Sequence, residues 1–436
     1  MTPHPVRALP ELTALLCLLF TLLVPFAAAG LALMNAGLGR SRNAAHMMLS
    51  GLCVFALAAV VFFVVGFAFQ GYSGRSAYEF MLRGKSWNWI AAERFFGRGL
   101  PLDGSPASLA ALLGMMSAGL AAVIPLGSGA DRLRLGAACI ATPGFAGWTY
   151  PLFAHWVWSG WLAQLGTNFS LGQGFVDSGG AAPIQAVGGL TGLAMTWVMG
   201  ARRGKYTADH MPMAIPGHNA VLVLLGCFFV WLGWIGLDCA GAILFTGAEA
   251  GRSVLIVVNA TLSAAAALLA AAAITRVRFG KPDASLCANG WVSGLVAGSA
   301  GCAVMPPAAA MIVGLVAGAL VTYAVELLEL HLTVDDPGGS ISVHLIGGIW
   351  GVLAVAWLGK FPGAENASGQ WLAQLAGVAS LLGFVLPFTY GLLRLLNHFY
   401  PLRVAPEGER QGMDLHELGA GAYPDFMSHN DDFFQR

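Results

Sequence analysis

The sequence has very little charge. Lys, Arg, Asp and Glu make up only 10% of its 436 residues, whereas 57% of the residues are hydrophobic. An ordinary soluble domain carries about 25% charged residues, so this chain cannot cover a water-facing surface. Its formal net charge of +0 also provides no basic surface, which argues against a nucleic-acid partner.

Cysteine and catalytic motifs are scarce as well. The seven cysteines lie mostly inside apolar runs, without Cys-x-x-Cys spacing, and no pair of histidines has a metal-ligand spacing. We therefore expect neither a disulfide framework nor a metal or other cofactor. The spacings of Gly-x-Ser-x-Gly, of His-Glu-x-x-His and of a phosphate-binding loop are missing too, which leaves an enzymatic function little support.

Long apolar runs dominate what is present. A helix needs about 20 apolar residues to cross a bilayer, and eleven stretches come near that length. They are 10–37, 46–70, 107–129, 136–158, 180–200, 215–240, 252–275, 285–303, 305–328, 340–359 and 370–398. We predict an all-α integral membrane protein over residues 1–400, with a tail at 401–436. The first run continues past the Ala27-Ala28-Ala29 segment to Met34, which predicts a retained helix rather than a cleaved signal peptide.

Basic residues collect in the short loops that follow odd-numbered spans. The loops after spans four and eight have no Lys or Arg, so the positive-inside rule places the N-terminus outside and the C-terminus in the cytoplasm. Two loops do not contribute: 71–105 is basic but long, and the loop before Asp335 has no Lys or Arg. The basic loop residues are Arg40, Arg42, Arg132, Arg134, Arg202, Arg203, Lys205, Arg276, Arg278 and Lys281.

One pattern of polar residues and glycines occurs twice, 159 residues apart. Five spans per copy is an odd number, so we predict two inverted repeats, at about 10–200 and 215–360, followed by a last helix at about 370–398. Inverted repeats bind their substrate where the two copies meet. The copies are Asp177, Gly179, Gly180, Gln185, Gly188, Gly189 and Gly192, and Asp336, Gly338, Gly339, His344, Gly347, Gly348 and Gly351.

Gln185 and His344 are the polar side chains that differ between the copies, and both then lie near the pseudo-twofold axis. An ionisable residue inside a membrane is costly and marks a pathway by default, so a functional role is favoured for His344 over a structural one. For Asp177 and Asp336, a role as helix N-cap is favoured over contact with a substrate, and Pro337 is expected at the first helical position. The glycines favour close helix packing. Other histidines near span ends, such as His46, are expected to be solvated.

Several ordered motifs resemble the ammonium transporter family (Amt/Mep/Rh) over nearly the whole chain. They are Ala154–Gly160, Asp177–Gly180, Leu232–Gly236 with Trp234, Val334–Pro337 leading to Val343-His344, and Gly412-Met413-Asp414. The resemblance implies eleven spans in the inner (cell) membrane, with the N-terminus on the outside. It also implies a homotrimer with one pore in each subunit, embedded in the lipid bilayer.

The resemblance assigns roles to single positions and exposes departures. Trp158 matches the aromatic residue that helps hold ammonium at the outer mouth, where a cation on an indole face gains about 1–2 kcal/mol. The chain departs from the family's pattern at five positions. Ser117 and Leu237 stand where two gating phenylalanines are usual, Gly241 replaces a serine, Asp238 an asparagine, and Gln185 the first pore histidine.

These departures leave two functions open. The first is a transporter that binds ammonium or methylammonium outside, removes its proton and passes ammonia through an apolar pore by Gln185 and His344. The second is a poorly conducting ammonium receptor that signals through its cytoplasmic tail. A glutamine amide cannot take up a proton as an imidazole does, which favours the second, whereas no kinase or cyclase domain follows residue 400, which favours the first.

The tail from Leu402 to Arg436 has mixed charge and few apolar residues, which alone predicts disorder. Gly412-Met413-Asp414 and Ala420–Tyr423 nevertheless resemble the family's tail. That resemblance implies a tail that packs under the neighbouring subunit, couples the pores and helps form a face that binds PII-type regulatory proteins.

Overall fold

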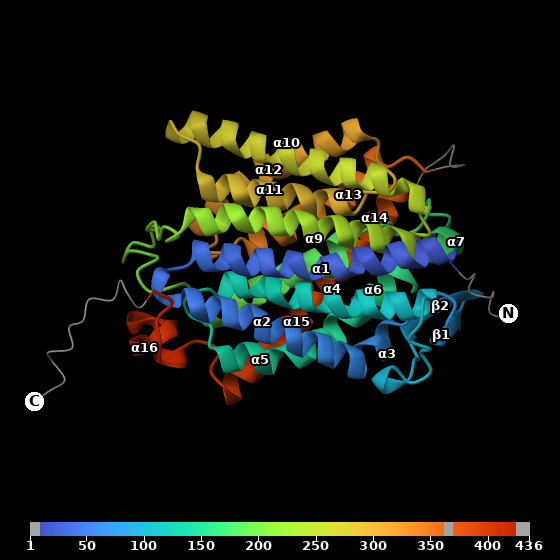
Figure 1. The fold of residues 1–436 in the computed structure, drawn as a ribbon, viewed down its shortest axis with the longest axis horizontal. Helices are drawn as coiled ribbons and strands as arrows, with labels where there is room; N and C mark the ends of the chain where they lie inside the picture. The colour runs from blue at the N-terminus through green and yellow to red at the C-terminus, as the bar shows by residue number, and fades with distance from the viewer. Residues whose placement is uncertain (1–8, 362–368, 424–436) are drawn as a thin grey trace, which may run out of the picture.

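The computed structural model describes residues 9–361 and 369–423, where the chain is mostly helical (Figure 1). Its long helices run side by side between two ends. One end carries the hairpin of β1 (Ala77–Leu82) and β2 (Lys85–Ala91), and the other carries the short helix α16 (Pro406–Gln411). We call them the hairpin end and the tail end. Residues 424–436 of the predicted tail lie outside the described residues.

The first part of the chain contains helices interrupted by wider π-helical turns. Its further elements are α1 (Glu11–Leu38), η1 (Ser41–Asn43), α2 (Ala44–Val61), η2 (Phe62–Gly66), α3 (Phe67–Gln70), η3 (Phe95–Gly97), α4 (Pro106–Gly129), α5 (Leu135–Gly144), η4 (Phe145–Thr149), α6 (Tyr150–Trp158), α7 (Leu165–Phe169), η5 (Ala181–Ala186) and α8 (Val187–Met199).

The second part begins with the long helix α9 and ends in the tail. Its elements besides α16 are α9 (Ala220–Thr246), η6 (Ala250–Arg252), α10 (Ser253–Phe279), α11 (Ala284–Ser299), α12 (Pro307–Leu330), η7 (Ser340–Leu345), α13 (Ile346–Leu358), α14 (Gln370–Ser380), η8 (Leu381–Val385), α15 (Leu386–Phe399) and η9 (Asp414–Leu418).

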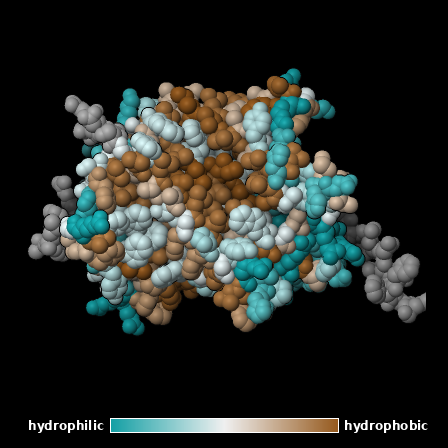
Figure 2. Space-filling model, turned by 180° about the vertical axis from the view of Figure 1, so that it is seen from behind, coloured by the Kyte–Doolittle hydropathy of each residue, from teal (hydrophilic) through white to brown (hydrophobic). Residues whose placement is uncertain are grey.

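Eight helical segments of the described residues are long and apolar enough to cross a membrane. The other three predicted spans fall on α5 to α6, on η5 with α8, and on α11, which do not meet the same measure, so the count of eleven stays a prediction. Figure 2 shows apolar residues gathered across the middle of one face. Val221 of α9 and Val277 of α10 are 74% and 86% exposed, and apolar side chains exposed to this extent need lipid or another subunit against them.

Small residues let the helices approach closely, as the sequence predicted. A Cβ atom placed on Gly30 of α1 would lie 2.6 Å from the carbonyl oxygen of Gly226 in α9, and one on Gly226 would lie 2.6 Å from the carbonyl oxygen of Gly30. Neither position has room for a methyl group. The two helices are therefore held together by backbone contact, which replaces the weak hydrophobic drive for association in lipid.

Charged residues at the tail end are buried in pairs. The guanidinium of Arg202 donates to both carboxylate oxygens of Asp335, at 2.9 and 3.0 Å, and to Asp131 at 3.1 Å. Arg132 donates to the carbonyl oxygen of Asp335 and lies 3.6 Å from its carboxylate. Burial works to raise the pKa of Asp335, but these guanidinium groups outweigh it and bring the pKa to about 2. Each of these buried charges has an opposite charge beside it.

The described part of the tail is docked on the bundle. Asp414 accepts hydrogen bonds from the backbone N–H groups of Ala45 and His46 at the start of α2, and Met413 donates its N–H to the side chain of Asn43. Glu417 contacts the imidazole of His46 at 2.9 Å. His46 is therefore 2% exposed and not solvated. The expectation for this histidine was wrong because its partner lies far away in the sequence.

Candidate functional site

The two copies of the repeated pattern begin in similar ways, at opposite ends of the bundle. Asp177 accepts the N–H groups of Gly180, Ala181 and Ala182 at the start of η5. Asp336 accepts those of Ile341 and Ser342 at the start of η7. Both carboxylates thus satisfy N–H groups that the first helical turn leaves free, which confirms the predicted capping.

One detail of that prediction was wrong. Pro337 is not the first helical residue, because the helix begins only at Ser340. Gly339 has a φ of +74°, and Gly180 of the other copy has a φ of +90°. This left-handed conformation suits glycine and turns the chain sharply into each helix. The proline belongs to the turn before it.

Gln185 and His344 meet in the interior. The Nδ1 atom of His344 lies 2.9 Å from Oε1 of Gln185, and the two residues are 0% and 3% exposed. An amide oxygen only accepts hydrogen bonds, so Nδ1 carries the hydrogen and Nε2 of the neutral ring keeps a free lone pair. The Gln185 amide nitrogen has no hydrogen-bond partner among the described residues. The pair therefore offers one acceptor and one donor to a small polar molecule.

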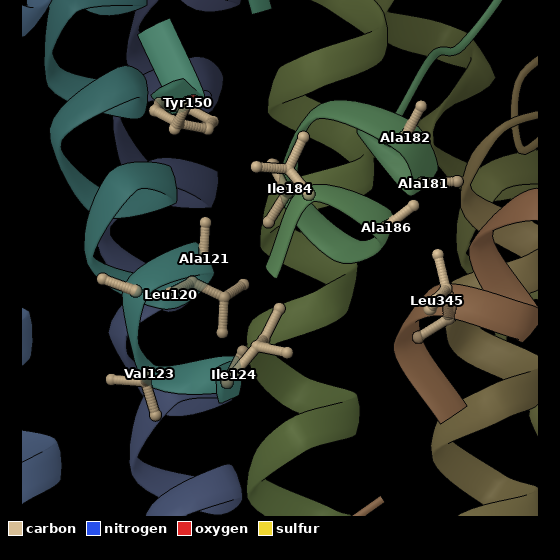
Figure 3. Packing of buried hydrophobic residues seen from close by; sticks show 14 of the residues in the cluster. Leu120, Ala121, Val123, Ile124, Tyr150, Ala181, Ala182, Ile184, Ala186 and Leu345 are labelled. Carbon is tan, nitrogen blue, oxygen red and sulfur yellow. The ribbon is translucent and has the colours of Figure 1, made fainter. Parts of the chain in front are cut away.

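Two glycines allow this meeting. A Cβ atom on Gly189 would lie 2.5 Å from the backbone nitrogen of Leu345, and one on Gly348 would lie 2.6 Å from the carbonyl oxygen of Ala181. Figure 3 shows η5, with Ala181 and Ala186, facing Leu345 across this crossing. Backbone contact at two points fixes the depth and the separation at which Gln185 and His344 face each other.

Four residues of α9 form one stripe along the helix: Trp234, Asp238, Gly241 and Phe245. Steps of four, three and four residues keep them on a single helix face. The ring centroid of Trp234 lies 6.4 Å from that of His344. A Cβ atom on Gly241 would lie 2.8 Å from the carbonyl oxygen of Ser178, and the ring of Phe245 stacks on another tryptophan. The α9 stripe thus follows the segment 177–180 toward the hairpin end.

Trp158 is the tryptophan at the end of the α9 stripe that lies toward the hairpin end. Its indole N–H donates to the carbonyl oxygen of Asp177 at 2.9 Å, and its ring stacks on Phe245 with a centroid distance of 4.0 Å and an interplanar angle of 5°. Both aromatic residues line a small cavity with Gln70, Tyr72 and Ser159. The sequence analysis missed Phe245, although its spacing from Gly241 and Trp234 could have identified it.

The remaining predicted residues lie nearby but are less informative. Leu237 on α9 and Ser117 on α4 are both 1% exposed, and the hydroxyl of Ser117 has no partner in the described chain. His155, which the sequence analysis did not single out, is buried between the carbonyl oxygen of Gln70 and the side chain of Asn88, at 2.8 Å from each. Its two nitrogen atoms are both occupied, which is typical of a structural histidine.

A membrane bundle with two capped segments that enter from opposite ends and meet at a buried polar pair is typical of transport proteins. Residues 15–423 match the model of the Ammonium Transporter Family, and the chain belongs to this family. It is 35% identical over 424 residues to "Ammonium transporter Amt2" of Archaeoglobus fulgidus, covering 93% of this chain and 86% of that one. It is 28% identical to "Ammonium transporter" of Bacillus subtilis, covering 93% and 97%.

Solved structures agree on the fold. One described as "Sensor Amt Protein" superposes with a TM-score of 0.83 at 27% identity, covering 93% of this chain and 98% of its own. Mep2 of Saccharomyces cerevisiae superposes with a TM-score of 0.78 at 24% identity, covering 92% and 90%.

Proposed function

We propose that this protein carries ammonium across the inner membrane. The cation enters at the hairpin end beside Trp158, gives up its proton, and passes as ammonia by Gln185 and His344 toward the tail end. The observation that carries the proposal is the buried pair of Gln185 and His344 at the crossing of η5 and η7. Moving a neutral molecule instead of an ion avoids a cost of several kcal/mol in an apolar environment.

The proposal includes the finer architecture. It comprises eleven spans in two inverted repeats plus a last helix, with the N-terminus outside and the C-terminus in the cytoplasm. Support for the orientation comes from Arg42, Arg134 and Arg203, which lie at the tail end beside Glu409 or Glu417. Basic loops gathered at one end of a membrane bundle are typical of the cytoplasmic side.

Flux in proteoliposomes tests the function. Purified protein should take up methylammonium, and ammonium should compete with it. Protein-free liposomes provide the background. Uptake no faster than this background would contradict the transport proposal.

An ammonium receptor is the second candidate. Gln185 in place of a proton-accepting histidine favours it, and one similar solved structure is described as a sensor. A receptor binds ammonium at equilibrium without carrying flux. Ammonium binding by the purified protein, together with no uptake by proteoliposomes, would therefore decide for this candidate.

The docked tail supports a proposal on assembly and control. We propose a homotrimer in which the tail couples the three pores and contributes to a face for a PII-type protein. Truncation after Leu402 removes the contacts of Met413, Asp414 and Glu417 with α2 and its neighbours. It should leave the trimer intact and lower activity, and mixed trimers with one truncated subunit should lose more than a third of their flux. A loss of one third for each truncated subunit would show uncoupled pores.

A further inference from the structure

Asp238 is the most unusual charged residue in the interior. It is 0% exposed, and neither of its carboxylate oxygens has a hydrogen-bond partner in the described chain. A buried carboxylate without a partner is costly, because it has lost water and gained nothing in exchange. Such a group must be neutral or must share its charge with a cation that binds beside it.

The hydroxyl of Ser299 does not supply the hydrogen bond that the Asp238 carboxylate lacks. Ser299 already donates its hydrogen to the carbonyl oxygen of Leu295 at 3.0 Å and accepts the indole N–H of Trp234 at 2.7 Å. A serine hydroxyl has one hydrogen, so Ser299 has none left to donate to Asp238. Its role is to hold Trp234, which lies one helical turn from Asp238 on the α9 stripe.

A second unpartnered group lies on the segment that Asp238 faces. The carboxylate contacts Gly179, where no side chain could be accommodated. The preceding residue, Ser178, is 0% exposed, and its hydroxyl also has no partner among the described residues. Ser178 and Gly179 are fixed by backbone hydrogen bonds of 3.0 Å to Ala300 and Ser299. Unused acceptors thus occur on two elements that are rigidly joined.

Asp238 lies between the two ends of the proposed pathway. Along α9, at about 1.5 Å per residue, Asp238 is about 6 Å from Trp234, which adjoins His344, and about 10 Å from Phe245, which stacks on Trp158. Ligands that pass from Trp158 to His344 along the α9 stripe therefore pass Asp238. Of the four residues of the stripe, Asp238 is the one with an ionisable side chain.

We propose that Asp238 is an internal binding station for ammonium, with its carboxylate and the Ser178 hydroxyl as acceptors. This rests on the proposed function but holds for a transporter and for a receptor alike. Four N–H groups let ammonium donate to several acceptors at once, which an alkali cation cannot do. Hydrogen bonds between charged groups are stronger than those between neutral groups, so the station binds ammonium more tightly than K⁺.

Calorimetry with purified detergent-solubilised protein at fixed pH tests the station. Asp238→Asn keeps the side-chain shape and removes the charge, and it should weaken ammonium binding about tenfold or more, the scale of one hydrogen bond to a charged group. Ser178→Ala should weaken it less. Glu249→Gln changes an exposed carboxylate just beyond α9 and should leave binding unchanged. K⁺ at the same concentrations should give no comparable heat.

The outcomes separate this station from the transport proposal. Unchanged affinity in both Asp238→Asn and Ser178→Ala overturns the station, even where proteoliposomes carry flux. Equal binding of K⁺, or no ammonium binding by the wild-type protein, overturns it as well. Binding that depends on Asp238 in a protein that carries no flux supports the station and contradicts transport.

Discussion

The tail end and the α9 stripe both bury charged or polar side chains, but they treat them differently. At the tail end, Asp335 has Arg202 and Arg132 beside it. Along the stripe, Asp238 and the neighbouring Ser178 have no partner in the described residues, and Gln185 leaves its amide nitrogen unused. Pairing contributes to a single stable fold, whereas unused hydrogen-bonding groups are costly to fold and are retained where a ligand can use them.

The sharpest test of this difference is a broken pair at the tail end. Asp335→Ala leaves Arg132 buried without its nearest carboxylate and Arg202 with Asp131 alone, and breaking a buried pair in this way costs about 3–5 kcal/mol. We expect a large fall in the yield of folded protein and in its melting temperature in detergent. Arg203→Ala, whose side chain is 44% exposed, serves as the matched control and should behave as wild type. A fully stable Asp335→Ala protein would show that this pairing does not support the fold.

His344→Ala should have the opposite effect. Removing the imidazole should lower uptake by about tenfold, or ~1.4 kcal/mol in the barrier, while the protein stays folded and its oligomeric state is unchanged. The reason is that His344 supplies the free acceptor at the crossing, and no other titratable group is bonded to it in the described structure. Uptake is measured in proteoliposomes, with the exposed His398→Ala as control. Wild-type flux in His344→Ala would remove this residue from the mechanism.

The Gln185→His variant tests whether the amide of Gln185 takes part in transport or only lines the proposed pathway. A second imidazole beside His344 can accept a proton, which the amide cannot do. We expect a change in the charge moved per ammonium, with a smaller effect on total uptake than loss of His344. Membrane current and uptake, measured together across pH, give the ratio. If the charge moved per ammonium and its pH profile are the same in both proteins, Gln185 only lines the pathway.

The smallest effect is expected from pH on the docked tail. Burial works to raise the pKa of Glu417, but the hydrogen bonds from His46 and from the backbone of Leu135 outweigh it, and the pKa is lowered. Ionised Glu417 therefore stabilises docking at pH values above its ordinary pKa, and this contribution is lost as pH falls through the lowered value. Hydrogen exchange of residues 402–423 should rise in acid, and Glu417→Gln should weaken that dependence. Equal pH dependence in both proteins would refute this role.

Apolar runs predicted most of the helices, and the repeated pattern predicted both caps. These features depend on residues close together in the sequence. The start of η7 was misplaced at Pro337 because the left-handed Gly339 delays the helix, which proline alone does not indicate. The buried state of His46 depends on Glu417, 371 residues away, and the stacking of Phe245 on Trp158 depends on two helices meeting. The spacing along α9 could have placed Phe245 on the stripe, but its contact with Trp158 and that of His46 with Glu417 leave no local signal.

The crossing at Gly189 and Gly348 also limits how the molecule can move. Its two backbones already touch without room for a methyl group. A rocking motion that opened the two ends in turn would have to separate them and break the hydrogen bond between Gln185 and His344, which would leave both side chains unsatisfied in the interior. In the proposed transport, the bundle therefore acts as one rigid frame. Selection and passage of the permeant would then depend on small displacements of side chains such as Phe245, while the backbones at the crossing stay in place.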